Sequence, residues 1–179
     1  MNRFVRISAV VLLSTLALSA CSTDRKHGMC PGASVLANTA DASFFRDKAV
    51  GDPSGILYEV VAGGVTTDCT FDRDEGTTDS SLTITFRATR TPTGDAASYS
   101  LPYFVVLTRD GTRIVSRQIY AAPFTFQPGE ATTTFTADIP SLVTRLDNGK
   151  LPYDYGFLVG VQMTQDQLDY NKKMGRFSP

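Results

Sequence analysis

The feature that most constrains the fold of this chain is an alternation of apolar and polar side chains that recurs along its second half. Apolar residues alternate with threonine and arginine in residues 82–88, and residues 134–139 alternate in the same way. Every second residue of 155–163 is apolar, whereas residues 103–107 are apolar throughout. A period of two is typical of a strand with one buried face, and a short apolar run is typical of a strand covered on both faces. The pattern predicts an all-β fold.

Turn-forming residues separate these runs. Asp110-Gly111 lies between residues 103–109 and 113–120, and an Asp-Gly pair between β-prone segments predicts a hairpin. Strands recur about every ten to fifteen residues, a spacing that favours a sandwich of two sheets. We therefore expect residues 33–179 to form one all-β domain, an immunoglobulin-like or fibronectin-type antiparallel sandwich.

The end of the chain indicates the same architecture. A polar interval after Ile139-Pro140, followed by the strand expected at 155–163, resembles the crossover between strands E and F of immunoglobulin-like sandwiches. In such sandwiches a tyrosine near the start of strand F hydrogen-bonds back across the corner. Tyr153 and Tyr155 are both candidates, and a tyrosine that only packs is the alternative. Because the chain has no tryptophan, an antibody-type domain is excluded.

One short helix is expected near the C-terminus. Thr164 and Gln167 have the spacing of a capping box, in which the two side chains satisfy amides at the start of a helix. Lys172 and Lys173 suit the negative C-terminal end of a helix, and Gly175 can terminate it. We expect this helix to cap the sandwich.

The first twenty-one residues predict export and anchoring. Arg3 and Arg6 precede an apolar run at residues 7–17, which is shorter than the ~20 residues that a membrane-spanning helix needs. The run ends at Leu18-Ser19-Ala20-Cys21, which resembles the lipobox of bacterial lipoproteins. The resemblance implies that residues 1–20 are a cleaved signal helix and that Cys21 carries lipid. A membrane anchor or a buried helix is the alternative, but neither explains two small residues followed by cysteine.

The predicted lipid would hold the protein on the periplasmic side of a membrane, because two or three acyl chains anchor a protein firmly. Ser22 follows the cysteine, and in envelopes of this type a residue other than aspartate favours the outer membrane over the inner one. We expect residues 21–32 to be a lipidated tether. Without residues 1–20 the chain has 15 basic and 18 acidic side chains, a net charge of −3 that gives no reason to expect nucleic-acid binding.

Two further cysteines, Cys30 and Cys69, are expected to form a disulfide, because an exported protein reaches an oxidising compartment. Two free buried thiols are the alternative. Cys30 and Cys69 are thirty-nine residues apart, whereas zinc ligands usually come in closely spaced pairs, so no metal site is expected there. The single histidine, His27, is interpreted as a solvated tether residue.

The search for catalytic groups finds little. A serine or cysteine nucleophile needs a nearby histidine, and the only one is His27. No catalytic residue and no cofactor is therefore predicted. Acids gather only at Asp72, Asp74, Glu75 and Asp79, a pattern that partly resembles a calcium loop but lacks its terminal glutamate.

We interpret this acidic segment as a solvated hairpin turn. Glu59, an acid within an apolar run, is expected to be exposed or paired with an arginine rather than to act as a general base. Several aromatic residues gather around the expected hairpin, and their alternation favours a place in the core over an exposed binding patch. They are Tyr99, Tyr103, Tyr120, Phe124 and Phe126.

The chain resembles a group of proteobacterial envelope lipoproteins to which no activity is assigned. The resemblance rests on Cys30-Pro31, Val35-Leu36-Ala37, Cys69, and the segments at 156–162 and 167–171. It brings no catalytic residues. Our first hypothesis is a lipid-anchored, non-enzymatic module that contacts an unknown envelope protein or polymer. The alternative is a lipoprotein that binds a small or lipidic molecule between its sheets or beside the aromatic hairpin, and an enzyme is the third possibility.

Overall fold

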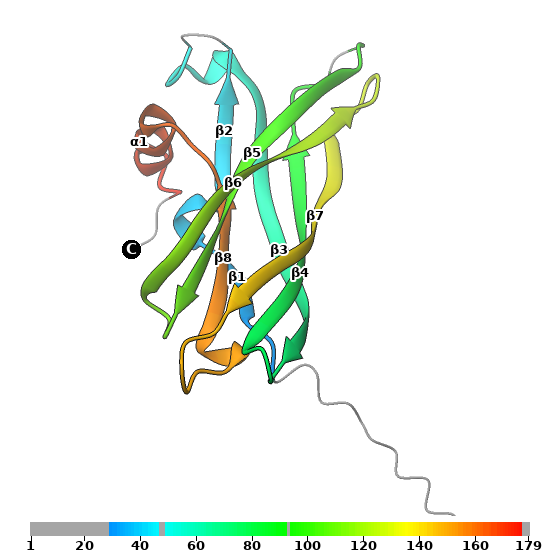
Figure 1. The fold of residues 1–179 in the computed structure, drawn as a ribbon. Helices are drawn as coiled ribbons and strands as arrows, with labels where there is room; N and C mark the ends of the chain where they lie inside the picture. The colour runs from blue at the N-terminus through cyan, green and yellow to red at the C-terminus, as the bar shows by residue number, and fades with distance from the viewer. Residues whose placement is uncertain (1–28, 47–48, 93, 177–179) are drawn as a thin grey trace, which may run out of the picture.

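The computed structural model describes residues 29–46, 49–92 and 94–176. Within these residues the chain forms two four-stranded sheets packed face to face, with one short α-helix near the C-terminus (Figure 1). The predicted all-β sandwich with a short C-terminal helix is confirmed. The predicted signal peptide and the lipidation site at Cys21 lie outside the described residues.

Sheet A is the sheet that contains the predicted Asp-Gly hairpin. Its strands lie in the order β1 (Gly32–Val35), β8 (Tyr155–Val161), β5 (Ala97–Arg109) and β6 (Arg113–Phe126). All neighbours are antiparallel except β1 and β8, which run parallel. Asp110 and Gly111 turn between β5 and β6 with φ of 52° and 75°, the left-handed region that a tight hairpin requires.

Sheet B is antiparallel throughout. Its strands lie in the order β2 (Asp41–Phe45), β3 (Ile56–Asp72), β4 (Thr77–Thr89) and β7 (Thr132–Arg145). A β-bulge interrupts the pairing of β3 with β4 between Ala62 and Gly64. Because the bulge inserts one residue, the inward-facing positions of β3 change from Tyr58 and Val60 to Val65 and Cys69.

The strand order is that of an immunoglobulin-like sandwich. β4 and β7 are neighbours in sheet B, as strands B and E are in that fold. β5 and β8 are neighbours in sheet A, as strands C and F are. β3 takes the place of strand A, and β6 lies beside β5 as strand C′ does. The described strands depart from the pattern in three places: β1 lies beside β8 where strand G would be, β2 lies outside β3, and no strand lies beside β7 where strand D would be.

The helical segments are short. They are the 3-10 helices η2 (Ala37–Thr39), η3 (Pro53–Gly55) and η4 (Pro152–Asp154) and the α-helix α1 (Gln165–Lys173). The predicted capping box of α1 is confirmed, because Gln167 N donates to Thr164 Oγ1 at 3.3 Å and Thr164 N donates to Gln167 Oε1 at 2.9 Å. No helix in the described part of the chain is long and apolar enough to cross a membrane.

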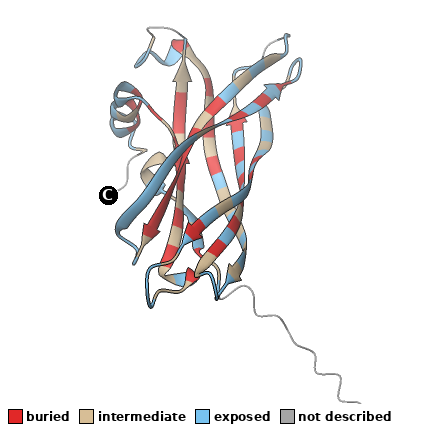
Figure 2. Ribbon diagram, in the orientation of Figure 1, coloured by how far each residue is buried: buried red, intermediate tan, exposed pale blue. Residues whose placement is uncertain are grey.

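The core is filled by the inward-facing side chains of both sheets, which appear as alternating buried positions along the strands (Figure 2). The aromatic residues of the β5–β6 hairpin belong to it. Phe124 stacks on Phe135 of sheet B with ring centres 4.4 Å apart, and Tyr99 and Tyr120 pack against the core as partly buried residues. The interpretation of these aromatic residues as core is confirmed.

Two long-range links close the sandwich. Tyr155 is buried and its hydroxyl accepts a hydrogen bond from Asp147 N at 3.0 Å, whereas Tyr153 is exposed. Tyr155 is therefore the tyrosine that closes the corner before β8. Cys30 and Cys69 are disulfide-bonded, with Cα atoms 5.6 Å apart. Since Cys30 precedes β1 and Cys69 lies on the inner side of β3, the disulfide links sheet A to sheet B.

The helix α1 covers one edge of sheet B. Gln167 Nε2 donates to the carbonyl oxygen of Ser43 at 3.0 Å, and Asn171 Nδ2 donates to that of Asp41 at 2.7 Å. Both carbonyls belong to β2, the first strand of sheet B. Side-chain amides of α1 thus satisfy backbone acceptors that a further strand would otherwise satisfy.

Candidate functional site

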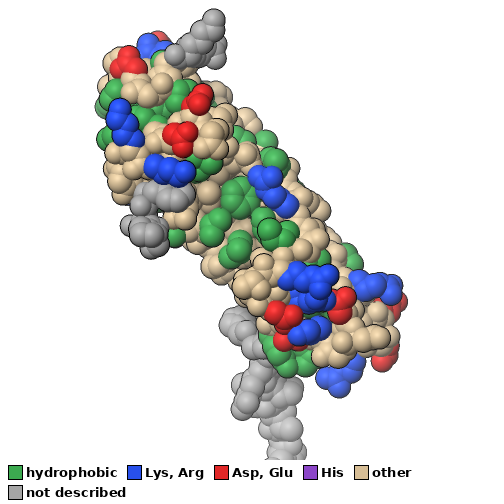
Figure 3. Space-filling view, turned by 90° about the vertical axis from the view of Figure 1, so that its left-hand side faces the viewer, with side chains coloured by type: hydrophobic (Ala, Val, Ile, Leu, Met, Phe, Trp, Pro, Cys, Tyr) green, Lys and Arg blue, Asp and Glu red, His purple; other side chains and the backbone are tan. Residues whose placement is uncertain are grey.

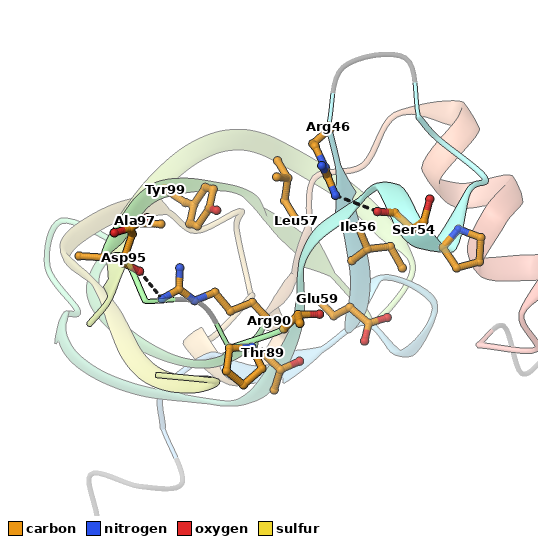
Figure 4. Close-up of a pocket in the computed structure, with 14 residues that line it drawn as sticks. Arg46, Ser54, Ile56, Leu57, Glu59, Thr89, Arg90, Asp95, Ala97 and Tyr99 are labelled. Carbon is orange, nitrogen blue, oxygen red and sulfur yellow. Dashed lines mark hydrogen bonds between the residues drawn. The ribbon is translucent and has the colours of Figure 1, made fainter. Parts of the chain in front are cut away.

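A large cavity lies at the end of the sandwich where β2 leads into β3 and β4 leads into β5. It has a volume of about 840 Å³ and is lined by both charged and apolar residues. Figure 4 shows Arg46 and Glu59 on one side of this cavity and Arg90, Asp95 and Tyr99 on the other. Its size is sufficient for a small ligand.

The charged groups of this end cavity are engaged within the protein. Arg46 Nη2 donates to the carbonyl oxygen of Ser54 at 2.9 Å. Arg90 donates to three backbone carbonyls, those of Glu130, Asp95 and Gln127, and its guanidinium lies 4.6 Å from the centre of the Phe126 ring. These arginines hold the surrounding loops in place.

Glu59, at the rim of the same cavity, is paired with an arginine, as expected from its place in an apolar run. Its carboxylate accepts hydrogen bonds from Arg176 Nη2 and, at 3.1 Å, from Ser43 Oγ. Arg176 Nη1 also donates to Ser43 Oγ at 2.7 Å. Glu59 therefore fastens the segment after α1 to sheet B.

The acidic segment does not form a metal site. Asp72 Oδ1 accepts hydrogen bonds from the backbone amides of Asp74 and Glu75 at 2.9 Å and so closes the turn between β3 and β4. Asp79 lies within β4 and accepts a hydrogen bond from Ser141 Oγ at 2.7 Å. Among the described residues, no three histidine, cysteine or acidic side chains come together in a way that could hold a metal ion.

The second feature that could bind a partner is the first half of β6, residues Arg113–Tyr120, which we call the β6 edge segment. β6 is the outermost strand of sheet A, and within the described residues its second edge has no strand beside it. Residues 113–119 are all exposed, in contrast to the alternating burial of residues 121–126. Three of them are apolar, with Ile114 66%, Val115 48% and Ile119 57% exposed.

An apolar groove of about 250 Å³ borders the inner side of this segment. The groove lies between the two sheets, and its walls come from β5, β6, β7 and β8. Val115, Gln118 and Tyr120 line it on the β6 side, and Leu142 and Val143 line it on the β7 side. Val143 is 71% exposed. The apolar lining of the groove also includes Val105, Leu107 and Phe157.

The outer face of sheet A is also apolar beside the β6 edge segment. Phe104 is paired in register with Ile119, and Val106 with Arg117. The Arg117 guanidinium lies 5.3 Å from the centre of the Phe104 ring and bonds to Gln162 Oε1. Figure 3 shows hydrophobic side chains gathered in the middle of this side of the molecule, with most charged side chains toward its two ends.

Charged pairs fix the turn of the β5–β6 hairpin. Lys150 Nζ donates to Asp110 Oδ1 at 2.6 Å, and this hydrogen bond lowers the pKa of Asp110 and raises the pKa of Lys150. Arg109 pairs with Asp147 in the same loop region. In the groove, burial raises the pKa of Tyr120. The β6 edge segment therefore begins at a fixed turn.

Sequence analysis did not identify the β6 edge segment as a site. Its signal is the loss of alternation in residues 113–119, where Ile114 and Val115 are adjacent and two arginines interrupt the strand. That pattern predicts a strand without predicting which face is buried. Exposure of both faces became visible only when the neighbours of β6 were known.

No family model, curated protein or solved structure matches this chain. The fold defines the molecule as an immunoglobulin-like β-sandwich protein with a covered edge at β2 and an open edge at β6. Its function has to be argued from these surfaces.

Proposed function

We propose that this protein is a non-enzymatic β-sandwich module that is held on the periplasmic side of a membrane, the outer membrane in preference to the inner, by lipid on Cys21. In this proposal it acts by contacting another envelope protein or an envelope polymer. The main support for the contact role is the β6 edge segment, which has three exposed apolar side chains and, among the described residues, no strand beside its outer edge. Large exposed apolar patches are typical of interaction sites.

Burial and hydrogen bonding favour a surface contact over a ligand held between the sheets. Large side chains such as Phe86, Phe126 and Leu101 fill the centre of the sandwich. In the 840 Å³ end cavity, Arg46 and Arg90 donate hydrogen bonds to backbone carbonyls of the surrounding loops. A ligand that bound to these arginines would compete with those hydrogen bonds. The small or lipidic ligand remains the alternative proposal.

Anchoring rests on the sequence Leu18-Ser19-Ala20-Cys21 and is tested by fractionation. A Cys21→Ser variant is expected to move from the membrane fraction to the soluble fraction, because the acceptor of the lipid is lost. Ser22→Ala, which keeps the cysteine, is the matched control and is expected to stay with the membrane. Membrane association of the Cys21→Ser variant would contradict the anchor.

The contact role is tested by a photo-reactive amino acid placed at Ile119 in the β6 edge segment. Thr85, which is exposed on the central strand β4, is the matched control position. In intact cells we expect an adduct of one discrete mass from position 119 and no such adduct from position 85. Equal labelling at the two positions, or no adduct at either, would contradict the proposal.

A further inference from the structure

We propose that the β6 edge segment binds an extended, acidic segment of a partner protein, which adds to sheet A as a fifth strand. This inference rests on the proposed contact function and names the kind of partner. Strand addition is a common way to recognise peptides, in which backbone hydrogen bonds supply affinity and side-chain pockets supply specificity.

Among the described strands, residues 113–120 of β6 lie at an outer edge and have exposed side chains along nearly the whole stretch. Residues 132–139 of β7 also lie at an outer edge and contain no proline, but their alternate side chains pack on the core. β2 is covered by the amides of α1, and β1 has only four residues. β7 contains Pro140 beside a register shift in its pairing with β4, which interrupts its edge. The second half of β6 contains Pro123, and a register shift in its pairing with β5 places an extra residue, Val115, near its start. Residues 116–120 contain neither a proline nor a register shift and can donate and accept at every second residue.

Side chains of an added strand would meet apolar surface on both faces of sheet A. Those on the inner face would enter the 250 Å³ groove between Gln118 of β6 and Leu142 of β7. Those on the outer face would lie beside Ile119 and, two positions away, Arg117. The site therefore fits a segment that is apolar on its inner side and combines an apolar and an acidic residue on its outer side.

The charge of the site selects the partner. β6 carries Arg113 and Arg117 and no acidic residue, and the end of β7 at residues 140–145 carries Arg145 and no acidic residue. Asp110, in the turn that precedes β6, is already paired with Lys150. A second copy of this chain would bring four arginines of two β6 edge segments together, and like charges on paired strands are destabilising. An acidic peptide meets complementary charge instead.

The probe is a blocked nine-residue synthetic peptide in which valine alternates with threonine and two threonines are replaced by glutamate. A second peptide carries lysine at those two positions, and a third carries proline at two valine positions of the glutamate peptide. We expect the glutamate peptide to bind the purified full chain at least about fivefold more tightly than the lysine peptide, the size that reversal of exposed ion pairs produces. We expect no binding of the proline peptide.

Two variants of the protein locate the site. Arg117→Glu and Arg113→Glu are each expected to abolish or reverse the preference for the glutamate peptide over the lysine peptide. Arg117→Glu also removes the contact between Arg117 and the Phe104 ring, whereas Arg113 is exposed and its replacement leaves that contact in place. Arg87→Glu is the matched control, because Arg87 is an exposed arginine on the outer face of sheet B. It is expected to leave the preference unchanged. Amide hydrogen exchange is expected to slow in residues 113–120 when the glutamate peptide binds.

Equal affinity for the two charged peptides, binding of the proline peptide, or protection outside residues 113–120 would overturn the inference. So would concentration-dependent dimerisation that protects the same amides without peptide, because the edge would then belong to a second copy. These failures are separable from failure of the proposed function. A discrete adduct at Ile119 together with no peptide binding would keep the contact role and reject the acidic strand.

Discussion

At Gly160 the space available to a side chain is smaller than a methyl group. A Cβ atom at this position of β8 would lie 2.0 Å from Thr39 Oγ1 and 2.5 Å from Cζ of the Phe104 ring. The glycine lets the Phe104 ring lie against the backbone of β8 on the outer face of sheet A, where Arg117 covers it. Gly160 thereby helps to position the residues beside the β6 edge segment.

Replacement of Gly160 by alanine is expected to destabilise the fold by about 1–3 kcal/mol, because the methyl group must displace the Phe104 ring or Thr39. Gly156→Ala in the same strand is the matched control, since its methyl group would lie 3.5 Å from the Gly32 carbonyl oxygen and 3.6 Å from Thr108 Oγ1, ordinary contact distances. Urea denaturation measures both variants. Equal free energies of unfolding for the two would contradict the steric argument.

Single residues were predicted from the sequence where the chemistry was local. The capping residues Thr164 and Gln167 lie three positions apart, so their pairing follows from the helix itself. Glu59 was expected to pair with an arginine, but its partner Arg176 is 117 residues away. Only the packing of α1 against β2 brings these two side chains together, and no local pattern encodes that contact.

At the scale of elements, α1 and β2 fit each other because their repeats match. Gln167 and Asn171 are four residues apart on the helix, a rise of about 6 Å, and their acceptors on Ser43 and Asp41 are two residues apart on a strand, about 6.7 Å. Two amides on one face of the helix can therefore reach two successive outward carbonyls of the strand. The helix protects this edge in the way that a neighbouring strand would.

Loss of this protection is expected in an Asn171→Ala variant. Asn171 is 1% exposed, and its removal leaves the Asp41 carbonyl without that donor, which costs about 1–3 kcal/mol for a buried polar group. Hydrogen exchange is expected to quicken in residues 41–45. Gln165→Ala is the control, because Gln165 is exposed and bonds only to Asp169 within the helix. Unchanged exchange in β2 would show that α1 does not protect the edge.

Whether a strand could be predicted from the sequence also depends on which elements pack against it in the fold. β4, β7 and β8 were predicted because one face of each lies on the core, and this burial imposes the period of two that the sequence shows. The β6 edge segment has no buried face along residues 113–119, so no periodicity marks it. Its open edge results from the order of strands in sheet A, which long-range pairing determines.

At the scale of the whole molecule, the disulfide is the covalent link between the two sheets. Cys30 and Cys69 enclose a loop that includes β1, β2 and most of β3. Reduction, or a Cys30→Ala/Cys69→Ala double variant, is expected to lower the free energy of unfolding by about 4 kcal/mol in the chain-entropy description of a loop of this length. Urea denaturation with and without reductant measures the loss.

The double variant also provides the control for this measurement. Reductant is expected to destabilise the unmodified protein and to have no effect on the Cys30→Ala/Cys69→Ala variant, because the variant has no Cys30–Cys69 bond to reduce. If reductant affected both proteins equally, the stabilisation would not come from the Cys30–Cys69 bond. A preserved fold after reduction would show that the apolar core alone is sufficient for folding.

The position of the disulfide also determines how the molecule responds to mechanical force. Cys30 precedes β1 and is bonded to Cys69 of β3. Force applied to the chain before Cys30 is therefore transmitted through the disulfide to β3, and the four-residue strand β1 does not bear it alone. β3 has 17 residues and is hydrogen-bonded along most of its length to β4. Tension would therefore load a long strand pair along its axis, where many hydrogen bonds must break together. A module tethered at its N-terminus and pulled by a partner on β6 would resist unravelling strand by strand.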